Sequence, residues 1–313
     1  MAEHSNSLKS IFFALGANLA IFTAKLTAAI ITGSGAMLAE AVHSLADCGN
    51  QLLLLVGLKQ AKRPATAEYP LGFGKSIYFW SFIVALIMFS MGGVFSIYEG
   101  LHKLQHPAPL SSPWLAIGVL VFSIVAESVS LWGCLREVNK VRQGRSLVRW
   151  FRESRQSELI VVFGEDLAAL FGLVLALIAI FVTILTGDPF WDALGSIGIG
   201  ILLVLVALFI GIEVKSLLIG QSTAPRVRKA IEEHLAAQPE IGRLINVITL
   251  QLGQDVMVAV KAEMRDCTDQ NELIAAINAC ERRLKNGFPQ IRWTFFEPDC
   301  GDRIDAAVVR AGH

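Results

Sequence analysis

Residues 36–58 read AMLAEAVHSLADCGNQLLLLVGL, a largely apolar stretch that includes two acidic residues and a histidine. About 20 such residues suffice for a helix to cross a membrane. Ionisable groups are costly in hydrocarbon and persist there mainly where they face a partner, a cavity or a transported ion. His43 and Asp47 are four residues apart, which places them on one helix face, one turn apart. An imidazole and a carboxylate in this arrangement suit Zn²⁺ or a similar divalent metal, so the stretch predicts a metal site inside a membrane.

The composition is that of a membrane protein. Of the 313 residues, 54% are hydrophobic and 17% are charged, whereas soluble domains have about 25% charged residues. The formal net charge is zero, so no nucleic acid is expected as a partner. The five cysteines contain no CxxC pair, which argues against a disulfide framework and a cysteine-rich zinc site. No HExxH motif is present, which argues against an intramembrane metalloprotease, and we expect a protein that is not an enzyme.

Six apolar segments predict an all-α, six-helix transmembrane bundle within residues 1–215. They cover roughly residues 8–32, 36–58, 77–101, 114–135, 159–185 and 190–214. Basic residues are concentrated in the loops 59–75 and 136–155, so the positive-inside rule places both termini in the cytoplasm. The short polar N-terminus has neither the layout of a signal peptide nor the composition of a transit peptide, which favours a bacterial inner membrane.

Residues 216–313 have the polar composition of a globular domain and predict a small cytoplasmic α+β unit. One helical pattern begins at Pro225, and a second covers residues 272–286. β-rich runs cover residues 245–252, 256–264 and 291–297. The order αββαβ suits a ferredoxin-like sheet with helices on one face.

Further ionisable residues lie inside the predicted spans. Asp166 is a second candidate metal ligand, and its neighbour Glu165 either joins the site or forms a structural pair with another helix. Glu127 and Glu40 are candidate outer-shell acids or proton carriers. Glu127 can instead be a packing residue, and Glu40 is expected to line an outer vestibule. Asp192 is assigned a structural role at the N-terminus of its own helix, where a carboxylate satisfies free N–H groups.

Other features of the spans allow structural interpretations. His43 and Asp47 can instead form a hydrogen bond that packs helices together. Lys25 is expected to pair with one of the buried acids, although the sequence does not say which. The glycines at residues 92–93 and 198–200 hint at a seam where two helices approach closely.

The chain resembles the cation diffusion facilitator family over nearly its whole length. Residues 33–47 (GSGAMLAEAVHSLAD) are similar to the family's second-helix motif, and residues 69–75 (YPLGFGK) to its turn before the third helix. Residues 188–196 (DPFWDALGS) resemble the entrance of its sixth helix. The pattern departs at Val162, because the family usually has a histidine four residues before the acid at position 166. This departure resembles the branch that includes the mitochondrial-type zinc transporters.

The resemblance implies a homodimeric secondary transporter that moves a divalent cation, Zn²⁺ first, out of the cytoplasm in exchange for H⁺. His43, Asp47, Asp166 and Glu165 are the expected metal ligands. The C-terminal domain is expected to mediate dimerisation, lipid to surround the helices, and no cofactor is expected besides the transported ion. Loss of one histidine leaves an oxygen-rich site, so Mn²⁺, Fe²⁺ and Co²⁺ are alternatives. A proton-coupled transporter of an organic solute is a further alternative.

Overall fold

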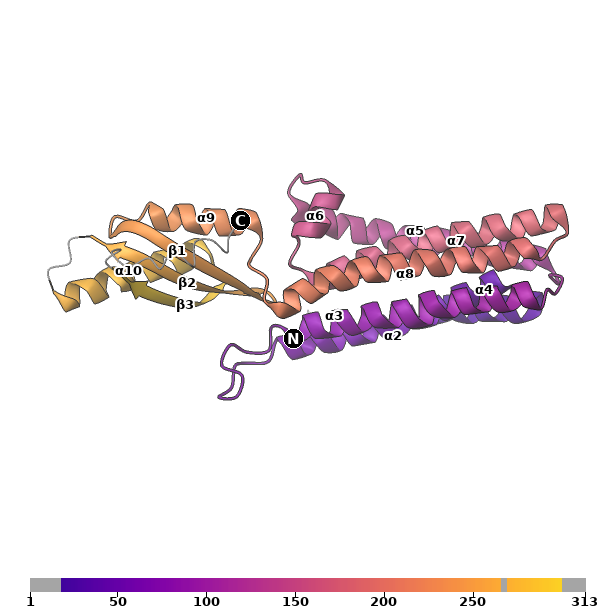
Figure 1. Cartoon of the computed structure of the whole chain (residues 1–313), viewed down its shortest axis with the longest axis horizontal. Coiled ribbons are helices and arrows are strands. Elements are labelled where there is room, and N and C mark those ends of the chain that lie inside the picture. The colour runs from indigo at the N-terminus through magenta and orange to yellow at the C-terminus, as the bar shows by residue number, and fades with distance from the viewer. Residues whose placement is uncertain (1–17, 266–268, 300–313) are drawn as a thin grey trace, which may run out of the picture. The chain divides into compact units, whose positions relative to one another are not determined.

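The structure is a computed structural model that describes residues 18–265 and 269–299, and these form two compact units (Figure 1). The first unit contains the long helices and extends to Lys215, without residues 61–75 and 153–156. The second unit contains those two short segments together with the chain from Ser216 onward. Two loops of the predicted helical domain thus group with the C-terminal unit.

In the described chain, five helices are long and apolar enough to span a membrane. They are Gly35–Ala61 (α2), Ser76–Gln105 (α3, η1 and α4), Pro113–Arg142 (α5), Ser157–Thr186 (α7) and Phe190–Ile219 (α8). They correspond to five of the six predicted spans. The remaining span, predicted for residues 8–32, begins outside the described residues, and its described part is a shorter apolar helix, Asn18–Thr32.

The third span is not one continuous α-helix. α3 (Ser76–Ile87) passes into a π-helical segment, η1 (Met88–Val94), and then into α4 (Phe95–Gln105). A Cβ atom on Gly93 would lie 2.6 Å from Val204 Cγ2 of α8, and one on Gly200 would lie 2.7 Å from the Gly93 carbonyl oxygen. The predicted glycine seam is therefore present between the third and sixth spans, and it runs through Gly93 and Gly200.

A short helix, α6 (Leu147–Glu153), lies in the loop between α5 and α7 and was not predicted. Its Trp150 is 1% exposed and packs edge-on against Phe163 of α7, with ring centroids 5.7 Å apart. Phe151 stacks on Phe209 of α8 at 5.0 Å. The aromatic residues of this loop therefore tie the adjacent ends of two long helices together.

The C-terminal unit has the predicted element order αββαβ. Its elements are α9 (Pro225–Ala236), β1 (Ile241–Leu252), β2 (Asp255–Met264), α10 (Gln270–Gly287) and β3 (Ile291–Pro298). The central strand β2 runs antiparallel to β1 and parallel to β3. β1 begins at Ile241, earlier than the predicted residue 245. Its pairing with β2 continues beyond the apolar run as far as Ile241, with two register shifts near the start of the strand.

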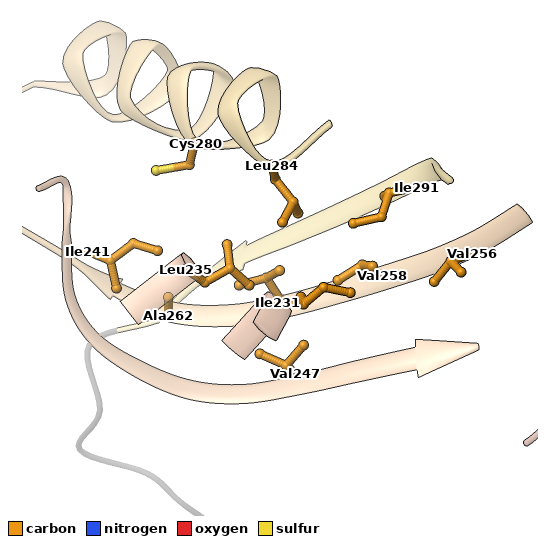
Figure 2. Packing of buried hydrophobic residues seen from close by; sticks show 11 residues of the cluster. Ile231, Leu235, Ile241, Val247, Val256, Val258, Ala262, Cys280, Leu284 and Ile291 are labelled. Carbon is orange, nitrogen blue, oxygen red and sulfur yellow. The ribbon is translucent and has the colours of Figure 1, made fainter. Parts of the chain in front are cut away.

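Both helices of this unit cover the same face of the sheet, as predicted (Figure 2). Figure 2 shows Ile231 and Leu235 of α9, and Cys280 and Leu284 of α10, among the strand residues of the core. The inward strand residues are Ile241, Val247, Val256, Val258, Val260, Ala262 and Ile291. Side chains of a strand alternate between its faces, so every second residue of β2 enters this core.

Part of the opposite face of the sheet is also apolar. Ile248 pairs with Ala259, which pairs with Phe295, so these three residues share that face. Ile248 and Phe295 are each 56% exposed. Contiguous exposed apolar surface of this kind is typical of an interaction site.

Candidate metal centre

One face of α2 carries Glu40, His43 and Asp47, as their spacing predicts. His43 is 1% exposed, and its Nδ1 lies 3.6 Å from Asp47 Oδ1. Neither ring nitrogen of His43 has a hydrogen-bond partner among residues 18–265 and 269–299. The alternative interpretation, a packing hydrogen bond from this histidine, is therefore not supported by the described chain. A buried imidazole without partners pays a desolvation penalty that a bound ligand would offset.

α7 brings two more carboxyl groups to the same region. Asn50 Nδ2 of α2 donates a hydrogen bond to Glu165 Oε1. Ser130 Oγ of α5 donates to Asp166 Oδ2 at 3.3 Å. Adjacent residues leave a helix about 100° apart, so Glu165 contacts α2 whereas Asp166 contacts α5. Glu165 thus forms a pair with another helix and lies in the same cluster as the predicted ligands.

These groups line one cavity of about 40 Å³ between the helix Asn18–Thr32, α2, α5 and α7. Its lining includes Asp47, Glu127, Glu165 and Asp166, and the other lining residues are Asn18, Ile21, Ser44, Gln51, Ser130, Val162 and Ala169. The cavity exceeds the roughly 10–15 Å³ that one water molecule needs, and its walls are largely polar. It is therefore sized for a small ion or a few waters.

Two of the lining residues bear on the sequence analysis. Ser130, which the sequence did not single out, lies three residues after Glu127 and so on the same side of α5. Its position about one helical turn from an intramembrane acid was the feature of the sequence that could have identified Ser130. Val162 lines the cavity one turn before Asp166. The position at which the related family usually has a histidine therefore faces the cavity here with an apolar side chain.

The candidate ligands lie in one region, but they do not surround a common point. No group of three His, Cys, Asp or Glu side chains within the described residues has the geometry to hold a metal ion. Asp47 and Glu165 nevertheless line the same cavity, and a metal would bind these carboxyl groups only in their deprotonated form.

Glu40 does not line this cavity. It is fully buried, and its Oε2 lies 3.1 Å from Nζ of Lys25, which is also fully buried. Lys25 Nζ donates a second hydrogen bond to Ser44 Oγ at 2.8 Å. The structure thus identifies the acid that pairs with Lys25. The burial of Glu40 against Lys25 does not support the expectation that Glu40 lines an outer vestibule.

Asp192 has a structural role at a helix other than the one predicted. Its carboxylate accepts hydrogen bonds from Ser34 Oγ at 2.5 Å, from the Gly35 N–H at 2.7 Å and from the Ala36 N–H at 3.4 Å. These donors belong to the start of α2, not to α8. The prediction of a bond to its own helix is corrected, because α2 begins beside the first turn of α8 and its N–H groups have no other acceptor in their own helix.

Comparison with known protein families identifies the proteins to which this chain is similar. Residues 11–219 match the family model described as the cation efflux transmembrane domain. The chain is 36% identical over 258 residues to the proton-coupled zinc antiporter SLC30A9, mitochondrial, of Xenopus laevis, covering 82% of this chain and 46% of that protein. It is 32% identical over 219 residues to metal tolerance protein C4 of Arabidopsis thaliana, covering 69% of this chain and 48% of that protein.

A more distant relative is the magnetosome protein MamB of Magnetospira sp. strain QH-2, which is 26% identical over 204 residues, covering 65% of this chain and 64% of that protein. The chain spans about half the length of the first curated relatives it matches, with 46%, 50% and 42% of those proteins covered. The family match and the long apolar helices make this an integral membrane protein. The chain belongs to the cation efflux, or cation diffusion facilitator, family of transporters, resembles its mitochondrial-type zinc transporters, and is not an enzyme.

Proposed function

We propose that this chain is a secondary transporter that exchanges a divalent metal cation for H⁺ and that Zn²⁺ is its preferred metal. The observation that carries the proposal is the gathering of carboxyl groups from α2, α5 and α7 around one ion-sized cavity, with His43 beside Asp47. Ionisable groups inside a membrane mark ion pathways by default. The name of the Xenopus laevis relative, a proton-coupled zinc antiporter, agrees with this assignment.

Coupling to protons follows from the chemistry of the ligands. Carboxylates and imidazole bind a metal only when deprotonated, so metal binding releases protons and protonation releases metal. Asp47 and Glu165 line the same cavity inside the membrane, which makes them natural exchange points. Metal entry would remove protons from these groups, and the return of protons would expel the metal. Exchange of the two species is therefore a property of the same side chains.

The donor set favours Zn²⁺ without excluding other metals. His43 supplies one nitrogen, while Asp47, Glu165 and Asp166 supply oxygen. Zn²⁺ accepts mixed nitrogen and oxygen ligands in four-coordinate sites. With Val162 in place of a second histidine, the set is richer in oxygen, so Mn²⁺, Fe²⁺ and Co²⁺ are the alternatives of the same class. Organic solutes are disfavoured, because binding pockets for them are usually about 300–1,000 Å³ and this cavity has about 40 Å³.

A homodimer is part of the proposal. Its support is the apolar sheet face of the C-terminal unit, where Ile248 and Phe295 are exposed beside Ala259. The same face on a second copy would cover it in a symmetric interface. Placement of both termini in the cytoplasm rests on the basic loops, and export from the cytoplasm rests on the family resemblance. The relatives whose names contain the word mitochondrial lend no support to a bacterial inner membrane.

The test is metal-driven proton movement in proteoliposomes that contain the purified chain and a pH-sensitive dye. Zn²⁺, Mn²⁺, Fe²⁺ and Co²⁺ are added separately to wild type, to Asp47→Asn and to Glu99→Gln. Glu99 is a matched control, because it is an acid of the same bundle that does not line the cavity. We expect flux with at least one metal, loss of flux in Asp47→Asn and normal flux in Glu99→Gln. Equal flux in wild type and Asp47→Asn would refute the assignment.

A further inference from the structure

Lys25 is a buried cation that the transport chemistry above does not use. It lies in the helix Asn18–Thr32 and is 0% exposed. Its ammonium group has two hydrogen-bond partners, Glu40 Oε2 at 3.1 Å and Ser44 Oγ at 2.8 Å, both on α2. A lysine buried among membrane helices is rare and costly, so its presence beside a cluster of acids calls for a function.

Glu40 occupies a position from which it could join the metal ligands. It precedes His43 by three residues and Asp47 by seven, so the three share one face of α2. Its Oε1 is buried and has no hydrogen-bond partner within the described part of the chain. That oxygen also faces α7, because a Cβ atom on Gly172 would lie only 2.5 Å from it. Gly172 follows Glu165 by seven residues and so lies on the same side of α7.

Glu40 therefore lies between the two helix faces that carry the candidate ligands, with one oxygen already held by Lys25 and the other unpaired. An extra carboxylate one helical turn from His43 would raise the number of oxygen ligands available to an ion bound at His43. More oxygen ligands favour Mn²⁺ and other hard cations that prefer six-coordinate sites, whereas Zn²⁺ is satisfied with four ligands that include nitrogen.

We propose that Lys25 is a selectivity residue: by holding Glu40 as its counter-ion, it keeps this carboxylate out of the metal site and disfavours Mn²⁺ relative to Zn²⁺. The inference rests on the proposed function, since it assumes that a divalent metal binds beside His43 and Asp47. Lys25 touches no candidate ligand itself and acts through Glu40. The ion pair joins the helix Asn18–Thr32 to α2, so it also fixes the position of Glu40 on the α2 face.

The experiment measures equilibrium binding of Zn²⁺ and of Mn²⁺, each alone, to the full chain purified in detergent. The quantity compared is the ratio of the two dissociation constants in wild type, Lys25→Met, Lys25→Gln and the double variant Lys25→Met/Glu40→Gln. Both single variants free the Glu40 carboxylate, and we expect them to bind Mn²⁺ about tenfold more tightly relative to Zn²⁺, as one additional charged ligand would allow. The double variant removes that carboxylate, so its ratio should return to the wild-type value.

The variants also guard against misfolding. Lys25→Met leaves a buried acid unpaired and is the variant most at risk, whereas Lys25→Gln keeps an N–H donor for Ser44. A neutral amide holds a carboxylate more weakly than an ammonium group does, so Glu40 becomes available to a metal in Lys25→Gln. The double variant removes both charges of the pair together, a change that buried ion pairs often tolerate. The binding ratio is read only from variants that elute as folded protein, and Lys25→Gln with the double variant is sufficient to decide.

Each outcome has one meaning. If wild type binds neither metal, the proposed function fails and this inference fails with it. If wild type binds Zn²⁺ but Lys25→Gln keeps the wild-type ratio, the ion pair is only structural and this inference alone is overturned. If the double variant loses Zn²⁺ affinity, Glu40 is itself a ligand in the wild type, which also overturns the selectivity role of Lys25.

Discussion

Substitution of Gly200 by alanine tests the close packing between the third and sixth spans. An added Cβ atom would lie 2.6 Å from Ile97 Cγ1, 2.7 Å from the Gly93 carbonyl oxygen and 2.7 Å from the Ile97 backbone nitrogen. Two of these three atoms belong to the backbone, so the helices would have to move apart because no side-chain rotation relieves the contact. Gly198, two residues earlier on α8, is the matched control, because a Cβ atom added there would meet no atom within 4 Å.

The expected magnitudes follow from these contacts. Alanine stabilises a helix interior by about 1 kcal/mol relative to glycine, so Gly198→Ala should be neutral or stabilising by up to that amount. Overpacking destabilises by about 1–3 kcal/mol, and contacts with backbone atoms favour the upper end. After the helix gain is subtracted, Gly200→Ala should lose about 2 kcal/mol. The two variants should thus differ by about 2–3 kcal/mol in the free energy of unfolding.

The assay is thermal unfolding of the full chain in detergent at one fixed heating rate. At roughly 2–4 °C per kcal/mol for a domain of this size, the melting temperature of Gly200→Ala should lie at least about 4 °C below that of Gly198→Ala. If Gly200→Ala melts at the same temperature as Gly198→Ala, or above it, the helices do not meet at Gly200 as described. The packing argument would then be wrong.

Three further predictions concern other parts of the chain. Asp192→Asn should lower the melting temperature, measured against Glu99→Gln, because loss of a charged acceptor at a helix start costs about 1 kcal/mol; equal temperatures would contradict the assigned role. The Arg283 guanidinium lowers the pKa of Glu240 below its ordinary 4.5, so the stabilisation is present at neutral pH and is lost as the pH falls through the folded-state pKa. Hydrogen exchange in α10 should therefore be faster in Glu240→Gln than in wild type at neutral pH, and the difference should shrink as the pH falls through the folded-state pKa of Glu240, whereas a difference that does not change with pH would refute the prediction. Phe295→Glu on the open sheet face should convert the proposed dimer to a monomer in light scattering, and a monomeric wild type would remove the basis of the dimer.

Much of this protein could be predicted from local sequence. The spans follow from apolar length, which depends only on consecutive residues, and the αββαβ order follows from periodicity within each segment. The shared face of His43 and Asp47 follows from their spacing in a helix, whatever surrounds them. The importance of Glu165 and Asp166 followed from the cost of burying a charge in hydrocarbon, which is again a property of the segment that contains them.

Only the tertiary structure decided which of these groups meet. Lys25 pairs with Glu40, and Asp192 binds the start of α2. Glu165 contacts Asn50, while Asp166 contacts Ser130. All of these contacts depend on how separate helices are rotated and placed. The spacing of residues along one helix does not determine its rotation against another, because that rotation is set by side-chain packing over the whole interface. The sequence by itself therefore determined the segments and the residues with unusual chemistry, and helix packing determined their partners.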